Sequence, residues 1–206
     1  MNLKLRILAS FNCLLPIATF TLITATKTVE AQTTALDCLK EAANYFDSAI
    51  FGSSITKEKA ANLAAELCRE YQTPETLTCA KEAHKFFDGA LFGNFSNEER
   101  KERSLTLAVE LCKIAGTKQS VTCAKEAQSF LDSTFFGILN NQEKSERSTT
   151  LAVDLCRIGG TNEAVTCVKK AYPEFDRVLS GSDLSMNERR MQAVERAVEF
   201  CRQGDW

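Results

Sequence analysis

Residues 79–93 read CAKEAHKFFDGALFG, and residues 123–137 read CAKEAQSFLDSTFFG. Both stretches open on a cysteine, repeat apolar residues at helical spacing and close on Phe-Gly or Leu-Phe-Gly. This spacing is typical of an amphipathic α-helix with one apolar stripe. Because a short helical unit cannot cover its own apolar stripe, the repetition predicts a unit that packs against neighbouring copies of itself.

The chain contains four copies of this unit, and each begins and ends on a cysteine. The opening cysteines are Cys38, Cys79, Cys123 and Cys167, and the closing cysteines are Cys68, Cys112, Cys156 and Cys201. The first copy is shorter in its middle and the last copy matches least well, as expected for the ends of a stack, which have a neighbour on one side only. The repeats span roughly residues 32–72, 73–116, 117–160 and 161–206.

Each copy is predicted to form two antiparallel helices. A threonine is expected to cap the first helix, and the second begins with a serine or asparagine followed three residues later by glutamate, which is a capping-box pattern. These N-cap residues are Thr73, Thr117 and Thr161 for the first helix and Ser96, Asn140 and Ser185 for the second. The glycine that follows each first helix is expected to form a left-handed C-cap, at Gly52, Gly93, Gly137 and Gly181.

No stretch alternates apolar and polar residues as a strand does. We therefore expect an all-α fold of four tandem antiparallel helical hairpins with a period of about 44 residues. The hairpins stack as a short α-solenoid or wrap into a compact helical bundle. Residues 32–206 are expected to form this single helical repeat domain.

The N-terminus has the features of a secretory signal peptide. Lys4 and Arg6 precede an apolar stretch at residues 7–25, and small residues stand near Ala31. We predict cleavage after Ala31, so that residues 1–31 are removed; the alternative is that the stretch is retained as an N-terminal anchor. Once the signal is removed, no other apolar run is long enough to span a membrane.

The overall charge argues against two classes of partner. The 206-residue chain has a formal net charge of −2 at pH 7. Binding to nucleic acid or to an anionic membrane surface needs a basic face, and nothing in the sequence indicates one. The expected partner is therefore an unidentified protein or peptide, with no nucleic acid.

The eight repeat cysteines form an even set, which predicts disulfides in a secreted or periplasmic protein. In an antiparallel hairpin the start of the first helix lies beside the end of the second. This geometry favours the pairs Cys38–Cys68, Cys79–Cys112, Cys123–Cys156 and Cys167–Cys201.

A second pairing scheme has similar geometry. Cys112 and Cys123 are equally distant from the turn at Gly116, so a bridge could join each copy to the next, although Cys38 and Cys201 would then need each other. A metal site or a redox centre is not expected, because zinc ligands come in close pairs and redox centres use C-x-x-C, and neither pattern occurs.

Two rows of charged residues recur in the first helix of each copy. The acidic row is Asp47, Asp88, Asp132 and Asp176, and the basic row is Lys40, Lys81, Lys125 and Lys169. The simplest interpretation is a solvated face with local ion pairs. A second interpretation pairs Asp132 with Arg103 of the preceding copy, and a third makes the two rows a charged groove that binds an extended partner.

Two further features have simple interpretations. His84 is the only histidine, and because the other copies place Ala43, Gln128 and Tyr172 at its position, we expect a solvated surface residue. The phenylalanines before the capping glycines are expected to pack under the turns or to form an exposed contact strip. They are Phe51, Phe92 and Phe136.

The sequence contains no nucleophile, phosphate-loop or metalloprotease motif. We therefore expect no enzyme activity, no catalytic residue, no cofactor and no metal. Stacked helices present extended surfaces, so the favoured function is a protein- or peptide-binding module or scaffold. The alternative is a carrier of a lipid or another small hydrophobic ligand, and a secreted hydrolase is the least favoured.

Overall fold

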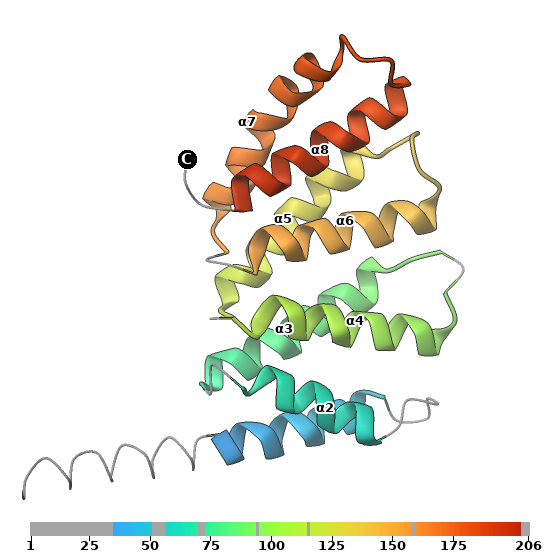
Figure 1. The fold of residues 1–206 in the computed structure, drawn as a ribbon. Helices are drawn as coiled ribbons and strands as arrows, with labels where there is room; N and C mark the ends of the chain where they lie inside the picture. Colours follow the sequence, from blue (N-terminus) through green and yellow to red (C-terminus); the bar gives the residue numbers. More distant parts are fainter. Residues whose placement is uncertain are drawn as a thin grey trace, which may run out of the picture. The chain divides into compact units, whose positions relative to one another are not determined.

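The computed structural model describes residues 35–50, 57–69, 73–93, 95–114, 116–157 and 160–202. The signal segment, its cleavage after Ala31, and the residues Phe51 and Gly52 lie outside these ranges. Residues 35–49 are helical, and seven labelled helices follow (Figure 1). They are α2 (Lys57–Leu67), α3 (Pro74–Ala90), α4 (Asn97–Cys112), α5 (Lys118–Thr134), α6 (Asn141–Cys156), α7 (Asn162–Leu179) and α8 (Met186–Arg202).

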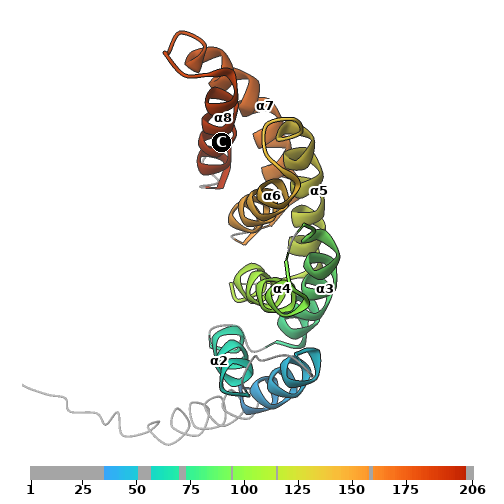
Figure 2. The same cartoon turned by 90° about the vertical axis from the view of Figure 1, so that its right-hand side faces the viewer.

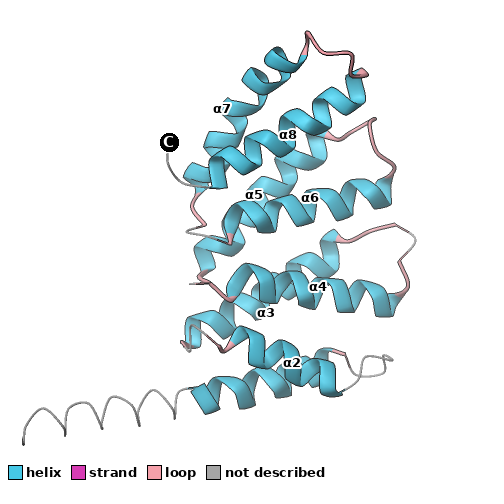
Figure 3. Ribbon diagram, viewed as in Figure 1, coloured by secondary structure: helices cyan, strands magenta, loops and turns pink. Residues whose placement is uncertain are grey.

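The part of the chain that the structure describes contains helices and loops and no strand (Figure 3). This confirms the all-α prediction. None of the helices within the described ranges is both long and apolar enough to cross a membrane.

Consecutive helices pair as antiparallel hairpins, and one disulfide bridges each hairpin. The bridges are Cys38–Cys68, Cys79–Cys112, Cys123–Cys156 and Cys167–Cys201. Their Cα atoms are 5.8–5.9 Å apart, within the usual range for a disulfide. The pairing is therefore the one within hairpins. Each bridge closes a loop of 30–34 residues in sequence separation, which stabilises the fold by roughly 3–4 kcal/mol in the chain-entropy model.

Within the unit formed by residues 34–206, the hairpins stack in two layers. The first helices pack in sequence, α3 on α5 and α5 on α7, and the second helices do the same from α2 through α4 and α6 to α8. Figure 2 shows these two rows side by side. Contacts between successive hairpins are those of a solenoid, in which each repeat is stabilised by its neighbours.

Equivalent positions of the sequence repeats are buried alike in the core. Phe46, Phe87 and Leu131 occupy the same position in three copies, and all are buried. On the second helices the residue before the closing cysteine is equally buried, at Leu67, Leu111 and Leu155. All eight bridged cysteines lie in this core as well, so the apolar stripe of each helix is covered by its hairpin partner and by the adjacent hairpins.

The predicted helix starts agree with the structure in position, although the Thr161 side chain accepts no capping hydrogen bond. Thr73 accepts a hydrogen bond from the backbone N–H of Thr76 at 3.3 Å. Ser96 and Glu99 form a complete capping box at the start of α4, and Asn140 accepts from the N–H of Glu143 at 2.9 Å. These contacts satisfy backbone donors that have no partner inside the helix.

The glycine C-cap prediction is only partly right. Gly93 and Gly137 do adopt positive φ, at 126° and 76°. However, the C-cap residues of α3 and α5 are Leu91 and Phe135, so these glycines lie in the loop two residues later. Gly181 has no positive φ. The glycines therefore turn the chain toward the second helix rather than ending the first.

Candidate functional site

An open groove of about 770 Å³ lies between α3 and α5. Its lining consists of Glu82, Lys85, Phe86, Gly89, Ala90 and Phe92 from the second hairpin and Lys125, Gln128, Ser129 and Asp132 from the third. The lining combines two phenyl rings with charges of both signs. The groove includes one member of each predicted charged row, Lys125 and Asp132.

Two lysines of the basic row lie over aromatic rings of the preceding hairpin. The Lys81 Nζ lies 5.6 Å from the centre of the Tyr45 ring, and the Lys125 Nζ lies 5.6 Å from that of Phe86. Such cation–π contacts hold an ammonium group beside an aromatic face. Phe86, which lines the groove, is half-buried, and its ring lies next to the Lys125 cation.

Gly89 leaves room in the groove. No heavy atom lies within 4 Å of the position that a Cβ would occupy there. The other copies carry Ser48, Ser133 and Arg177 at this position. A glycine inside a helix costs up to about 1 kcal/mol relative to alanine, so Gly89 lowers the stability of the second hairpin where it lines the groove.

Gln128 presents an unsatisfied polar group beside the groove. Its side chain is only 5% exposed, and its Oε1 has no hydrogen-bond partner among the described residues. A buried polar group without a partner costs about 1–3 kcal/mol. The amide has both a donor end and an acceptor end, so a backbone amide group of a bound chain would suit it once the side chain turns its enclosed oxygen toward the groove.

The acidic row is engaged within the hairpins. Asp88 accepts a hydrogen bond from Arg100 Nε at 3.2 Å, and Asp176 accepts one from Arg189 Nε at 2.9 Å. Asp132 accepts a hydrogen bond from the Ser148 hydroxyl, and Asp47 is exposed. Three of the four aspartates thus hold the first helix of their hairpin to the second.

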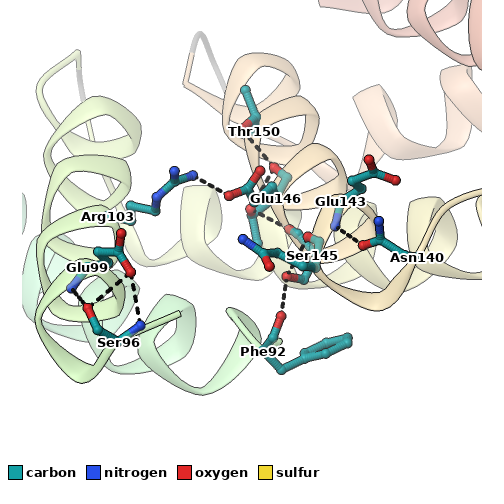
Figure 4. Close-up of polar contacts among 11 residues, drawn as sticks. Phe92, Ser96, Glu99, Arg103, Asn140, Glu143, Ser145, Glu146 and Thr150 are labelled. Atoms are coloured by element: carbon teal, nitrogen blue, oxygen red, sulfur yellow. Dashed lines mark hydrogen bonds and ion pairs between the residues drawn. The ribbon is translucent and has the colours of Figure 1, made fainter. Parts of the chain in front are cut away.

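The predicted pairing of Asp132 with Arg103 is wrong. The guanidinium of Arg103 instead contacts Glu146 of the next hairpin at 2.6 Å (Figure 4). Arg103 lies on α4 and reaches across to α6 in its own layer, whereas Asp132 lies on α5 in the other layer. The sequence placed both residues opposite the cysteines but did not indicate which layer each would face.

The Arg103–Glu146 pair belongs to a ladder that sequence reasoning missed. Lys59 pairs with Glu102, and Arg147 pairs with Glu195, so each junction between second helices has one such bridge. The available signal was an acidic–basic dipeptide at the same register, as in Glu102-Arg103 and Glu146-Arg147. Each pair is partly exposed and contributes about 0.2–1 kcal/mol.

In a second ladder of ion pairs, the base belongs to the later hairpin and the acid to the preceding one. The Lys113 Nζ lies 2.8 Å from a carboxylate oxygen of Glu66 in the preceding hairpin and 2.7 Å from one of Glu110. Arg157 contacts Glu110 in the same way at 3.9 Å. Burial alone would lower the pKa of Lys113, but its hydrogen bonds to Glu110 and Glu66 raise it. Many charged side chains of the second helices thus form ion pairs with one another.

The loop between α3 and α4 is tied to the third hairpin. The Ser145 hydroxyl donates to the backbone carbonyl of Phe92 at 3.0 Å (Figure 4). The Lys144 Nζ lies 5.6 Å from the Phe92 ring centre and 5.7 Å from that of Phe136. Both rings remain exposed, so these phenylalanines lie on the surface with a shared cation between them.

His84 is not a solvated surface residue, contrary to the sequence-based expectation. It is half-buried, and its Nδ1 lies 2.7 Å from the Tyr45 hydroxyl of the first hairpin. Burial lowers the pKa of the imidazole, with Asp88 raising it and Lys101 lowering it further. The face opposite the cysteines therefore includes part of the junction between hairpins.

No cluster of three or more His, Cys, Asp or Glu side chains suited to a metal ion occurs within the described ranges. No protein-family model matches the chain, and no curated protein or solved structure shows significant similarity to it. The fold itself defines the class: an all-α, disulfide-stapled protein of stacked helical hairpins.

Proposed function

We propose that the protein is an extracytoplasmic binding module that holds an extended segment of another protein in the groove between α3 and α5. The single observation that carries this proposal is the composition of the groove. It brings Phe86, the cation of Lys125 and the unsatisfied amide of Gln128 together in an open hollow of about 770 Å³. An extended peptide supplies side chains for the rings and backbone amide groups for the glutamine.

The disulfides support the extracytoplasmic part of the proposal. Four bridges within one chain require an oxidising compartment to form and persist. The apolar start of the sequence, with its predicted cleavage after Ala31, leads to the same location, secreted or periplasmic.

The groove is open to solvent, which suits a bound chain segment better than an enclosed lipid. A lipid carrier would surround most of its ligand with apolar side chains, whereas Glu82, Lys85 and Asp132 line this groove. The carrier therefore serves as a competing outcome of the test, and so does a hydrolase.

The test is selection of peptides from a random library displayed on phage, with the oxidised protein as bait. We expect the selected peptides to share apolar or aromatic residues beside a charged residue. Their binding should weaken at least tenfold in Gly89→Phe, because a Cβ at this position enters open space and the ring attached to it would occupy the groove. Ser133→Phe is the matched control, since Ser133 is exposed at the same repeat position on α5.

Three results would contradict the proposal. Peptides that bind Gly89→Phe as tightly as the parent protein would place their site elsewhere. Lipid that co-purifies with the protein at one molecule per chain, detected by mass spectrometry, would favour the carrier. Turnover in a broad hydrolase screen that disappears on substitution of one acidic residue would favour an enzyme.

A further inference from the structure

Similar residues recur at each junction between successive hairpins. We call the side of a hairpin that faces the preceding one its front and the side that faces the next one its back. The front of the first hairpin and the back of the fourth have no described hairpin against them. At the front of each hairpin an apolar residue stands two positions before the opening cysteine. In the second, third and fourth copies it is Leu77, Val121 and Val165, each 5% exposed or less. The first copy carries Leu36 at this position, and no described hairpin precedes it. Leu36 is 66% exposed.

The back of the last hairpin shows the complementary feature. The residue before the closing cysteine is a buried leucine in the first three copies. In the fourth copy it is Phe200, which is 52% exposed and packs its ring edge-on against Phe175. A hollow of about 280 Å³ beside Phe200 is lined by Cys167, Ala171 and the stems of Thr166 and Lys170. A terminal repeat that ends a stack usually has a polar outer face, and this one is largely apolar here.

The charges at the two ends are complementary. In the internal junctions Lys81 and Lys125 lie over Tyr45 and Phe86 of the preceding hairpin. The corresponding lysine of the first hairpin is Lys40, and the position of the aromatic residue in the fourth hairpin is occupied by Glu174. Both are exposed. A lysine that meets a ring inside the stack would therefore meet a carboxylate if the front of one molecule faced the back of another.

The second ion-pair ladder continues across the same ends. Inside the stack the base after a closing cysteine pairs with an acid of the preceding hairpin, as Lys113 does with Glu66. At the front the equivalent base is Arg69, and at the back the equivalent acid is Glu199. Glu174 and Glu199 also pair with arginines of their own helices, at 2.5 Å and 2.7 Å, as Glu110 pairs with Lys113 inside the stack. In both expected contacts, Lys40 with Glu174 and Arg69 with Glu199, the base lies at the front of one molecule and the acid at the back of the other.

We propose that the back of the fourth hairpin binds the first hairpin of a second copy of this chain, in a head-to-tail interface that repeats the internal junctions. Leu36 of one molecule occupies the hollow beside Phe200 of the other, as Val165 is covered within the stack. The interface is heterologous, so the association can continue beyond a dimer.

One internal contact is missing from this interface, which makes it weaker than a junction within the chain. The ladder that contains the Arg103–Glu146 pair needs a base at the position of Arg103 and Arg147, but the fourth hairpin has Gln192 there. The acid that it would meet, Glu58, is exposed on the first hairpin. The association is therefore reversible and depends on concentration.

Sedimentation velocity of the oxidised protein over a concentration series tests the proposal. We expect the weight-average mass to rise with concentration. Leu36→Glu and Phe200→Glu should each be monomeric alone, since each buries a carboxylate in an apolar contact. An equimolar mixture of the two should form dimers that do not grow, because one variant retains an intact back and the other an intact front. Dimers in the mixture also show that both variants are folded.

A gain of affinity provides an independent readout. Gln192→Arg restores the missing base, and we expect it to lower the concentration of half-association about two- to fivefold, as one ion pair would. Met186→Glu changes another exposed apolar residue of α8, outside the hollow, and should leave the association unchanged.

The proposal is overturned by a wild-type protein that remains monomeric at every concentration, which would leave the apolar end to a different partner. It is also overturned if Leu36→Glu still dimerises while Phe200→Glu does not. That pattern would indicate a symmetric dimer through two fourth hairpins.

Discussion

At the scale of single residues, the groove depends on two residues that reduce the stability of the free protein. Gly89 weakens the helix that carries it, and Gln128 has a buried amide oxygen that finds no partner in the part of the chain that the structure describes. Natural sequences commonly accept such local losses at functional sites. The same positions in other hairpins carry residues without this combination, such as Ser133 and Tyr172, which makes the second and third hairpins distinct from the rest of the stack.

Substitution of Gly89 by alanine should therefore stabilise the protein. The Cβ enters open space, and the helix gains about 0.5–1 kcal/mol. The shift in the free energy of unfolding can be measured by guanidinium chloride titration, with the disulfides intact. Ser133→Ala is the control, and it should gain less, because serine is a better helix former than glycine. A destabilised Gly89→Ala protein would contradict the open position of this residue.

His84 should make the stability depend on pH. Its folded-state pKa lies below the ordinary value of 6.5, first because of burial. The unfolded chain therefore binds more protons as the pH falls below 6.5, and the folded state loses stability over that range until its own pKa is reached. Above 6.5 the histidine is neutral in both states and contributes no pH dependence.

The measurement is the free energy of unfolding of the wild-type protein and of His84→Gln at pH 5 and at pH 8. Glutamine is the residue of the third hairpin at this position, so the variant keeps a polar partner for Tyr45. We expect the wild-type protein to lose more stability between pH 8 and pH 5 than the variant. Equal losses would mean that the histidine titrates alike in the folded and unfolded chains.

At the scale of the helical elements, the second and third hairpins are each fastened at three points along their length. The disulfide joins the open end, as Cys123–Cys156 does in the third hairpin. An aspartate of the first helix binds the second helix, as Asp88 does with Arg100. Between these points the buried phenylalanine or leucine packs against the partner helix. The bridge differs from the other two because it also restricts the unfolded chain.

Removal of the bridge of the third hairpin, in the double variant Cys123→Ala/Cys156→Ala, should lower the free energy of unfolding by roughly 3–5 kcal/mol. The variant should keep its helices, because the core around the bridge is apolar and the adjacent hairpins still cover it. Circular dichroism checks the helix content, and guanidinium chloride titration checks the stability. Assay of free thiols provides the control, since the other three bridges should leave none. A loss below about 1 kcal/mol would contradict the chain-entropy account.

At the scale of the whole stack, the architecture could be predicted from the sequence because the cysteines and caps are local signals with a fixed period. Antiparallel helix geometry predicts the hairpins and favours a bridge within each of them. It also permits bridges between successive copies, and the structure has those within hairpins. The ion-pair ladders were missed because a helical wheel shows that Arg103 points away from its cysteine but does not show which neighbouring helix it meets. The groove was missed for a related reason, since Gly89 opens a hollow only because α5 lies beside it.

The same kind of substitution at equivalent repeat positions should reduce the free energy of unfolding by different amounts, depending on the place of the hairpin in the stack. Leu155 and Phe200 both precede a closing cysteine, but Leu155 is fully buried by its neighbours whereas Phe200 is half exposed. Leu155→Ala should cost about 2–5 kcal/mol, because it removes buried surface and leaves a cavity. Phe200→Ala should cost well under half as much in the monomer, since its ring has less surface to lose from the core.

The comparison is made by guanidinium chloride titration at low protein concentration, so that association does not add to the stability of either variant. Leu111→Ala is the internal control and should behave as Leu155→Ala does, since it occupies the same position one hairpin earlier. Equal costs at Leu155 and Phe200 would mean that the back of the fourth hairpin is covered in the monomer. In that case the apolar end could not be a junction that awaits a further hairpin, and the head-to-tail interface would lose its physical basis.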